Sequence, residues 1–415
     1  MLRPPAPLRL LGVALAATLV GALSQAPAAA AQKPLDRSKP LTDPANDPYT
    51  RGGKEKYVEA AGYVSMGGFE FGAPPDTTAE VAGLLSGVEI RWIETAHFEL
   101  GVALPKVKVT KEERKKVKAE LTRLQKALPA VKPEARMLDP WLRAHLYAQR
   151  LEDHYATVQE ALGVSDETFA ANKEIWDIGT PYWGIGPYMG QMGKFEVLLL
   201  PSEKAATTFL TSRLGLTTKL SQRWNIRERD SLCLVAHTGQ GQLNVDEGMH
   251  GHVLFNVTHM MLNGFKHYSY DKPIWIREGA AHWFERELNP RFNTFDSSEG
   301  SAAEMFKKSD WTAPTLKLIK SKDCPSFASL VRIRTFAELD RPHHLMTWSV
   351  FDFLVKEHPD FLKAYLGAIS GIKNAEHIDD ATTLPDVQRQ LFRDELGMTY
   401  AQFEAAWRAW VSENY

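Results

Sequence analysis

The chain of 415 residues predicts an α+β fold, in which a small N-terminal sheet with helices precedes a mostly helical C-terminal lobe. Two observations support this prediction. Short apolar segments typical of strands occur only up to residue 236, whereas helical patterns follow one another from about residue 247. Strands that come first and helices that come later are typical of the α+β class.

The first 31 residues have the pattern of a secretory signal peptide. Arg3 and Arg9 form a basic start, residues 10–23 are apolar and uncharged, and Ala28 begins a run of four alanines suited to cleavage. The alternative is a membrane anchor, but the apolar run is shorter than the about 20 residues that span a bilayer. We therefore expect export to the periplasm or the extracellular space, with no transmembrane segment after cleavage.

Composition suggests the domain boundaries in the rest of the chain. Residues 32–56 are rich in proline, aspartate and lysine and are predicted to form a disordered linker. Residues 57–140 are expected to form an N-terminal α/β extension, and residues 141–415 the main domain. The formal net charge of −2 favours neither nucleic acid nor anionic lipid as a partner.

The N-terminal half combines predicted strands with predicted helices. Apolar segments predict strands over residues 88–93, 98–103, 195–200 and 231–236. Helical periodicity predicts helices over residues 110–128, 141–162 and 203–213. Thr110 and Glu113 are spaced as in a capping box, and Gly163 is placed to end the second helix.

The C-terminal half is predicted to be helical. The expected helices cover residues 247–264, 274–287, 344–357, 359–370, 386–396 and 399–412.

Two further features of the sequence have alternative interpretations. Tyr182 and Trp183, in an aromatic loop at residues 178–194, either pack internally or stack on a sugar or peptide. Cys233 and Cys324 either form a disulfide after export or remain buried thiols.

Histidine is concentrated in one window of the sequence. Six of the thirteen histidines lie between His237 and His282, where an even spread would place about one or two. Because histidine is the commonest metal ligand and a frequent acid–base group, this window is where a functional site is expected. His250 and His252 lie near a helix start, where exposed histidines are common.

Two predicted helices in this window carry the main motif. The first contains Phe-Asn-Val-Thr-His at residues 255–259, and the second contains Trp-Ile-Arg-Glu-Gly-Ala-Ala-His at residues 275–282. This order resembles the gluzincin metallopeptidases, specifically the peptidase MA-like group of exported bacterial proteins. That family has H-E-x-x-H on one helix and a glutamate ligand about 18–25 residues later. Glu278 follows His259 by 19 positions.

The likeness to this family covers most of the chain after about residue 88, because residues 94–98, 151–155 and 348–366 resemble further segments of it. It implies a two-lobed zincin fold with the peptidase MA-like domain at residues 141–415. It also implies a zinc ion with His259 and Glu278 among its ligands, and a peptide or an envelope component as the partner.

The motif departs from the family at two positions. Phe255 replaces the first histidine ligand, and Asn256 replaces the glutamate that acts as general base. Phenylalanine cannot bind a metal, and neutral asparagine cannot take a proton from water near pH 7. The first hypothesis is therefore an inactive pseudopeptidase with a binding or envelope role, without a cofactor.

Other residues offer alternatives. His282 lies four residues after Glu278 on the same helix face, so an active zinc hydrolase with a rearranged site of His259, Glu278 and His282 is the second hypothesis. His252 is a weaker candidate ligand, because its side chain leans away from His259. His344 opens a predicted helix, where we expect a surface position over a role in the cleft. A third hypothesis is a cell-surface glycan- or peptide-binding module that uses Trp183.

Overall fold

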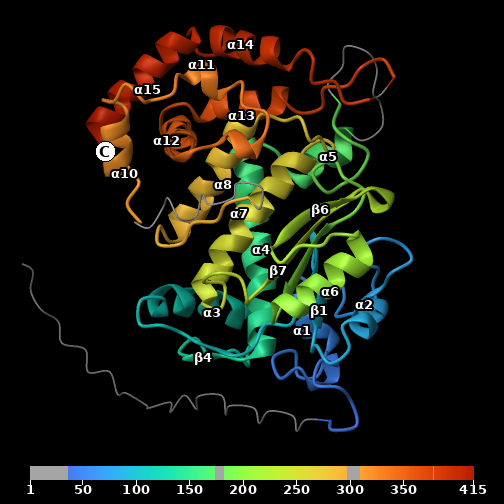
Figure 1. The fold of residues 1–415 in the computed structure, drawn as a ribbon. Helices are drawn as coiled ribbons and strands as arrows, with labels where there is room; N and C mark the ends of the chain where they lie inside the picture. Colours follow the sequence, from blue (N-terminus) through green and yellow to red (C-terminus); the bar gives the residue numbers. More distant parts are fainter. Residues whose placement is uncertain (1–35, 173–181, 297–308, 377) are drawn as a thin grey trace, which may run out of the picture. The chain divides into compact units, whose positions relative to one another are not determined.

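The computed structural model describes residues 36–172, 182–296, 309–376 and 378–415 (Figure 1). The predicted signal peptide lies outside these residues. The described chain contains a five-stranded mixed sheet and fourteen α-helices, which confirms the predicted α+β class. The two-lobed gluzincin arrangement stays a prediction. No helix in the described ranges is long and apolar enough to cross a membrane.

The five-stranded sheet has the order β1-β2-β5-β7-β6. Its strands are β1 (Arg91–Glu94), β2 (Phe98–Val102), β5 (Phe195–Leu200), β6 (Gln222–Ile226) and β7 (Ser231–His237). The three central strands are parallel, and β1 and β6 are antiparallel edge strands. The sequence predicts four of these strands but not β6. This edge strand is polar and only partly buried, so it lacks the apolar pattern that marks the others.

Helices cover both faces of the sheet. Along the fully buried strand β5, Val197 and Leu199 belong to the core formed with α4 (Pro140–Leu162) and α7 (Asp246–Gly264). Leu198 and Leu200 point the other way, into the core formed with α2 (Thr78–Leu84) and α6 (Glu203–Leu214). This alternation is the two-residue period of a strand that is buried on both sides.

Most of the other predicted helices are present, and several short elements accompany them. Asp139 caps the start of α4, and Gly163 ends it in a left-handed conformation with φ of 68°, as its sequence predicts. The remaining N-terminal elements are α1 (Glu55–Ala60), β3 (Val107–Lys108), α3 (Arg114–Ala127), β4 (Met137–Leu138) and α5 (Asp166–Asn172). The short 3-10 helices are η1 (Pro44–Asn46), η2 (Arg227–Arg229) and η3 (Phe336–Glu338).

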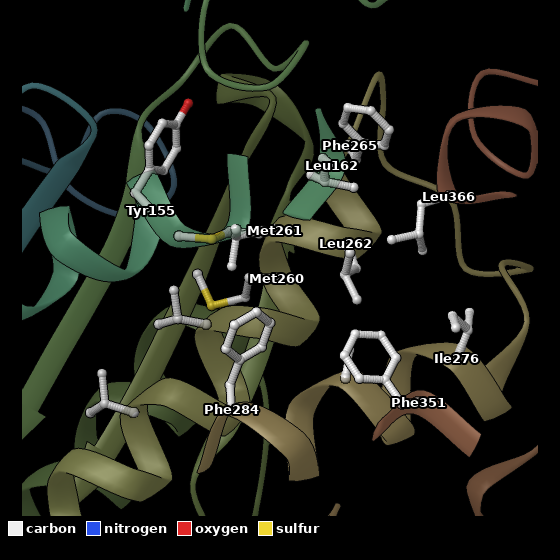
Figure 2. Packing of buried hydrophobic residues seen from close by; sticks show 14 of the residues in the cluster. Tyr155, Leu162, Met260, Met261, Leu262, Phe265, Ile276, Phe284, Phe351 and Leu366 are labelled. Atoms are coloured by element: carbon white, nitrogen blue, oxygen red, sulfur yellow. The ribbon is translucent and has the colours of Figure 1, made fainter. Parts of the chain in front are cut away.

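The C-terminal part is helical, as predicted, and most of its helices, coloured orange to red, gather at one end of Figure 1. They are α8 (Ile274–Leu288), α10 (Thr312–Leu318), α11 (Phe327–Leu330), α12 (Arg341–Glu357), α13 (Pro359–Ala368), α14 (Leu384–Asp394) and α15 (Tyr400–Asn414). Figure 2 shows how this end joins the rest: Met260 and Leu262 of α7 lie among Phe284 of α8, Phe351 of α12 and Leu366 of α13.

The expected division of the N-terminal region differs from the structure. Residues 36–56 belong to the predicted disordered linker, yet Asp47 is buried and its carboxylate lies 3.0 Å from Nε2 of His145 on α4. Tyr63 bonds to the other nitrogen of the same ring at 2.9 Å. Specific polar contacts therefore hold a segment whose composition is poor in apolar residues. The sheet also crosses the boundary expected at residue 140, because β2 pairs with β5.

The two cysteines are free thiols in the structure. Cys233 is buried in the sheet, and burial raises the pKa of its thiol well above the ordinary value. Cys324 is half-buried in the helical end. Of the two alternatives that the sequence leaves open, the structure therefore has the unpaired thiols.

Candidate functional site

Helix α8 lies between α7 and α12, and this packing positions the site. Gly279 in α8 is needed for the close approach: a Cβ atom there would lie 2.5 Å from the carbonyl oxygen of Thr347 and 3.1 Å from Cβ of Phe351, both on α12. A side chain at this position would push the helices apart. The glycine of the Glu-Gly-Ala motif thus places α12 directly against the helix that carries Glu278.

Glu278 is the hub of a buried polar cluster. Its Oε2 atom lies 3.1 Å from Nε2 of His259 on α7, so the contact expected between these two residues is present. Its Oε1 atom lies 2.9 Å from Nε2 of His282 and 3.6 Å from Nδ1 of His344 on α12. The two histidine nitrogens are 3.2 Å apart. None of the four side chains is exposed, with 0% accessibility for each.

The charges in this cluster follow from burial and contact. Burial alone would raise the pKa of Glu278, but the charge of His282 and hydrogen bonds from His259 and His282 hold it well below its ordinary range. Burial opposes protonation of His282, yet the charge and hydrogen bond of Glu278 raise its pKa. Burial lowers the pKa of His259 to about 4 and that of His344 to about 3. These shifts favour a charged Glu278 beside a more readily protonated His282, flanked by two imidazoles that are neutral at neutral pH.

Glu278, His282 and His344 could hold a metal ion, since their ligand atoms all lie within 4.8 Å of one another. A tetrahedral zinc ion with bonds of about 2.0–2.1 Å holds its ligand atoms about 3.3 Å apart, and the three contacts given above are close to this spacing. His259 is not part of the group, because it approaches the other oxygen of Glu278. The ring of Phe255 lies 4.9 Å from that of His259 and 5.1 Å from that of His282.

Asn256, at the position that the predicted likeness assigns to the general base, is held in a different network. Its Oδ1 accepts a hydrogen bond from Nη1 of Arg223 at 2.6 Å, and its Nδ2 donates to the backbone oxygen of His252 at 2.8 Å. Arg223, on strand β6, also pairs with Asp296. The Nδ1 atom of His252 lies 3.2 Å from the hydroxyl of Thr294. Each polar atom of the Asn256 amide therefore has a protein partner.

A pocket of about 630 Å³ opens beside Asn256. Strand β6, helix α7, the start of α8 and residues 291–296 line it. Asn256, His252 and Arg223 are among its walls, but none of the four residues of the Glu278 cluster is. A catalytic zinc site keeps an open coordination position that substrate can reach. The metal-capable group and the pocket are therefore separate places in this structure.

The other histidines that the sequence points to are buried. His250 and His252 are 5% and 4% exposed, so the expectation of exposed positions is wrong. Both residues lie in α7, and nearly all residues of this helix are buried. Burial, together with the nearby charge of Arg223, lowers the pKa of His252 to about 3 and keeps the ring neutral. His344 is likewise buried, where the sequence suggests a surface position.

The first residues of the predicted aromatic loop, 178–181, lie outside the described residues, and the contacts of Tyr182 and Trp183 are with other parts of the chain than the pocket. Trp183 packs edge-on against Phe169 and Phe265 and has the Lys266 ammonium 4.3 Å from its ring centre. Tyr182 lies against His267. Neither aromatic residue lines the pocket. A ligand-binding role for them stays a prediction.

The sequence does not single out Arg223 or Arg277, and it does not place His344 beside His282. His344 is 62 positions from His282, and nothing in the spacing links them before α12 is placed on α8. Arg223 lies on the unpredicted strand β6. Arg277 stands next to Glu278 inside the motif, and its pattern of neighbours gives no sign that it lines a pocket.

Comparison of the sequence with models of known protein families gives no match. Comparison with curated proteins gives no similar sequence. The likeness to gluzincins therefore rests on the motifs at residues 255–259 and 275–282 and on their order.

Proposed function

We propose that this chain is an exported, gluzincin-like pseudopeptidase that binds a ligand in the pocket beside Asn256 and does not cleave it. The observation that carries the proposal is the separation of pocket and cluster. The remaining ligand-type residues are enclosed, while the pocket wall presents Asn256, bonded to Arg223, where a peptidase has its general base. Loss of a general base alone costs about 10²–10⁴ in rate.

The contact between His259 and Glu278 supports a gluzincin ancestry. These two residues retain the helix positions of family ligands and still meet, at 3.1 Å. Phe255 packs between the His259 and His282 rings, where it excludes a third ligand from the His259 side. Two protein ligands hold zinc poorly, since zinc sites in proteins have three or four.

A digestion experiment tests this proposal. The purified chain is incubated with a peptide library and added zinc, beside a Phe255→His/Asn256→Glu variant that restores the H-E-x-x-H pattern. We expect no cleavage by the wild type, because it lacks both a ligand and a base. Cleavage that disappears in Glu278→Gln would overturn the proposal. Activity of the restored variant would show that the two substitutions are sufficient to explain the loss.

A second candidate is a metal ion held for stability by Glu278, His282 and His344. In this site His344 takes the place that the second hypothesis gives to His259, because the ligand atoms that lie close together belong to Glu278, His282 and His344. The three residues are buried and none of them lines the pocket, so the ion would hold α8 and α12 together and would not activate water. Zinc content after dialysis tests it: His344→Gln should lose the metal, and His259→Gln should keep it. Equal loss in both variants would sink this candidate.

A further inference from the structure

A buried arginine in the pocket wall has no counter-charge within the part of the chain that the structure describes. Arg277 is 3% exposed and lines the pocket. Its Nη1 donates to Oδ1 of Asn263 at 2.6 Å, its Nη2 makes a long bond of 3.5 Å to the backbone oxygen of Tyr270, and its Nε has no partner. Among the residues that the structure describes, no carboxylate forms an ion pair with this guanidinium. Burying a charge without a partner costs several kcal/mol.

Arg286, a second buried arginine on α8, has contacts that stabilise its charge. Arg286 is also buried, and burial lowers the pKa of each of the two arginines to about 10. Its guanidinium lies over the rings of Trp311 and Trp348, at 4.1 and 5.2 Å, and donates to the backbone oxygen of Ser309. Arg277 has only Phe336, at 5.6 Å, a weaker partner for a cation.

The charge of the pocket wall is positive. Three arginines and one aspartate line it, and the histidine in the wall is neutral. Arg223 is paired with Asp296, and Arg291 is exposed to solvent. Arg277 is thus the cation whose charge a ligand would balance. The planar guanidinium matches a carboxylate, which two adjacent N–H groups can bind together.

The uncharged part of the wall suits a ligand with hydroxyl groups. Seven side-chain amides line the pocket, and among them the side-chain oxygens of Gln222, Asn225 and Gln242 accept no hydrogen bond from the residues that the structure describes. An amide both donates and accepts, as hydroxyl groups require. Trp224 and Tyr270, with exposures of 38% and 66%, add open aromatic surface on which a sugar ring can lie. The volume is within the range of small-molecule sites.

We propose that the pocket binds a carboxylated saccharide, whose carboxylate pairs with Arg277 and whose hydroxyl groups bond to the side-chain amides. This inference rests on the proposed binding function and gives it a ligand class. The ligand supplies the counter-charge that no described residue provides at Arg277. Binding therefore stabilises a buried charge that is unfavourable in the free protein.

Titration calorimetry with matched probes tests the inference. The probes are digalacturonate, its methyl ester, and trialanine, which has a carboxylate but no hydroxyl groups. We expect digalacturonate to bind at least about tenfold more tightly than the ester, as for a charge-assisted hydrogen bond. Trialanine should bind more weakly than digalacturonate. No binding of digalacturonate, or equal binding of the ester, would overturn the inference without any mutation.

Two variants locate the recognition on α8. Arg277→Gln should bind the acid and the ester equally, while its melting temperature stays the same or rises, since it removes an unpaired buried charge. Arg286 is on the same helix and touches the pocket wall only through a hydrogen bond to Asn293, so Arg286→Gln should change the affinity for acid and ester equally and keep the preference for the acid. Retention of the preference in Arg277→Gln would contradict the assignment. Tighter binding of trialanine would overturn the saccharide class and leave the binding function standing, whereas cleavage of trialanine would refute the binding function itself.

Discussion

At the scale of single residues, the proposed loss of peptidase activity depends on two side chains. Phe255 packs against the rings of His259 and His282, and Asn256 bonds to Arg223, at the positions that the proposed likeness gives to a zinc ligand and to the general base. If the proposed likeness to gluzincins holds, the sequence is enough to point to both positions, because the spacing of 19 residues between His259 and Glu278 lies within the family's range. It could not place His344 in the cluster, since that contact depends on how α12 packs.

Buried neutral histidines make the stability sensitive to acid, and His154 offers a clear test. Burial lowers its pKa to about 4 from an ordinary value of 6.5, and its Nε2 lies 2.9 Å from the hydroxyl of Thr258. Between these two pH values the unfolded chain binds a proton that the folded chain does not. The stability therefore falls as the pH drops from 6.5 toward 4, by at most about 1.4 kcal/mol per pH unit for this group.

The variant His154→Gln removes this proton and can keep the hydrogen bond to Thr258. We expect its free energy of unfolding to fall less steeply than that of the wild type, by about 1 kcal/mol per pH unit between pH 6 and pH 5. Urea unfolding at the two pH values measures the difference. Identical slopes for the two proteins would contradict a neutral buried His154.

At the scale of elements, the packing of α8 against α12 assembles the cluster. The sequence predicts both helices within a few residues of their bounds, but it gives no information on which helix lies against which. Strand β6 is the opposite case, an element that the sequence does not predict at all. It is polar at the sheet edge and so lacks a strand pattern, yet it supplies Arg223 to the pocket.

Gly279 tests the helix contact. In Gly279→Ala the new Cβ would meet the Thr347 oxygen at 2.5 Å, so we expect a loss of about 1–3 kcal/mol in the free energy of unfolding. Gly367 in α13 is the matched control, because its Cβ would meet nothing within 4 Å. Gly367→Ala should stabilise the protein by up to about 1 kcal/mol through helix propensity. Equal effects in urea unfolding would argue against close packing of α8 on α12.

At the scale of the whole molecule, a mixed sheet covered on both faces supports a helical end that carries part of the site. The sequence predicts this general order correctly, because apolar periodicity reports on elements that face a core. It gives the wrong impression of residues 36–56, whose order depends on buried polar contacts such as Asp47 with His145. Composition does not reveal polar contacts that form only between distant segments.

The proposed binding function depends on the separation between the pocket and the metal-capable group. Anomalous scattering from zinc-soaked crystals of the full chain measures this directly. We expect zinc either to be absent from the cluster or to be bound by Glu278, His282 and His344, with no coordination position open to the pocket. Zinc bound by His259 and Glu278, with a free position facing the pocket beside Asn256, would contradict the account and restore a hydrolytic site.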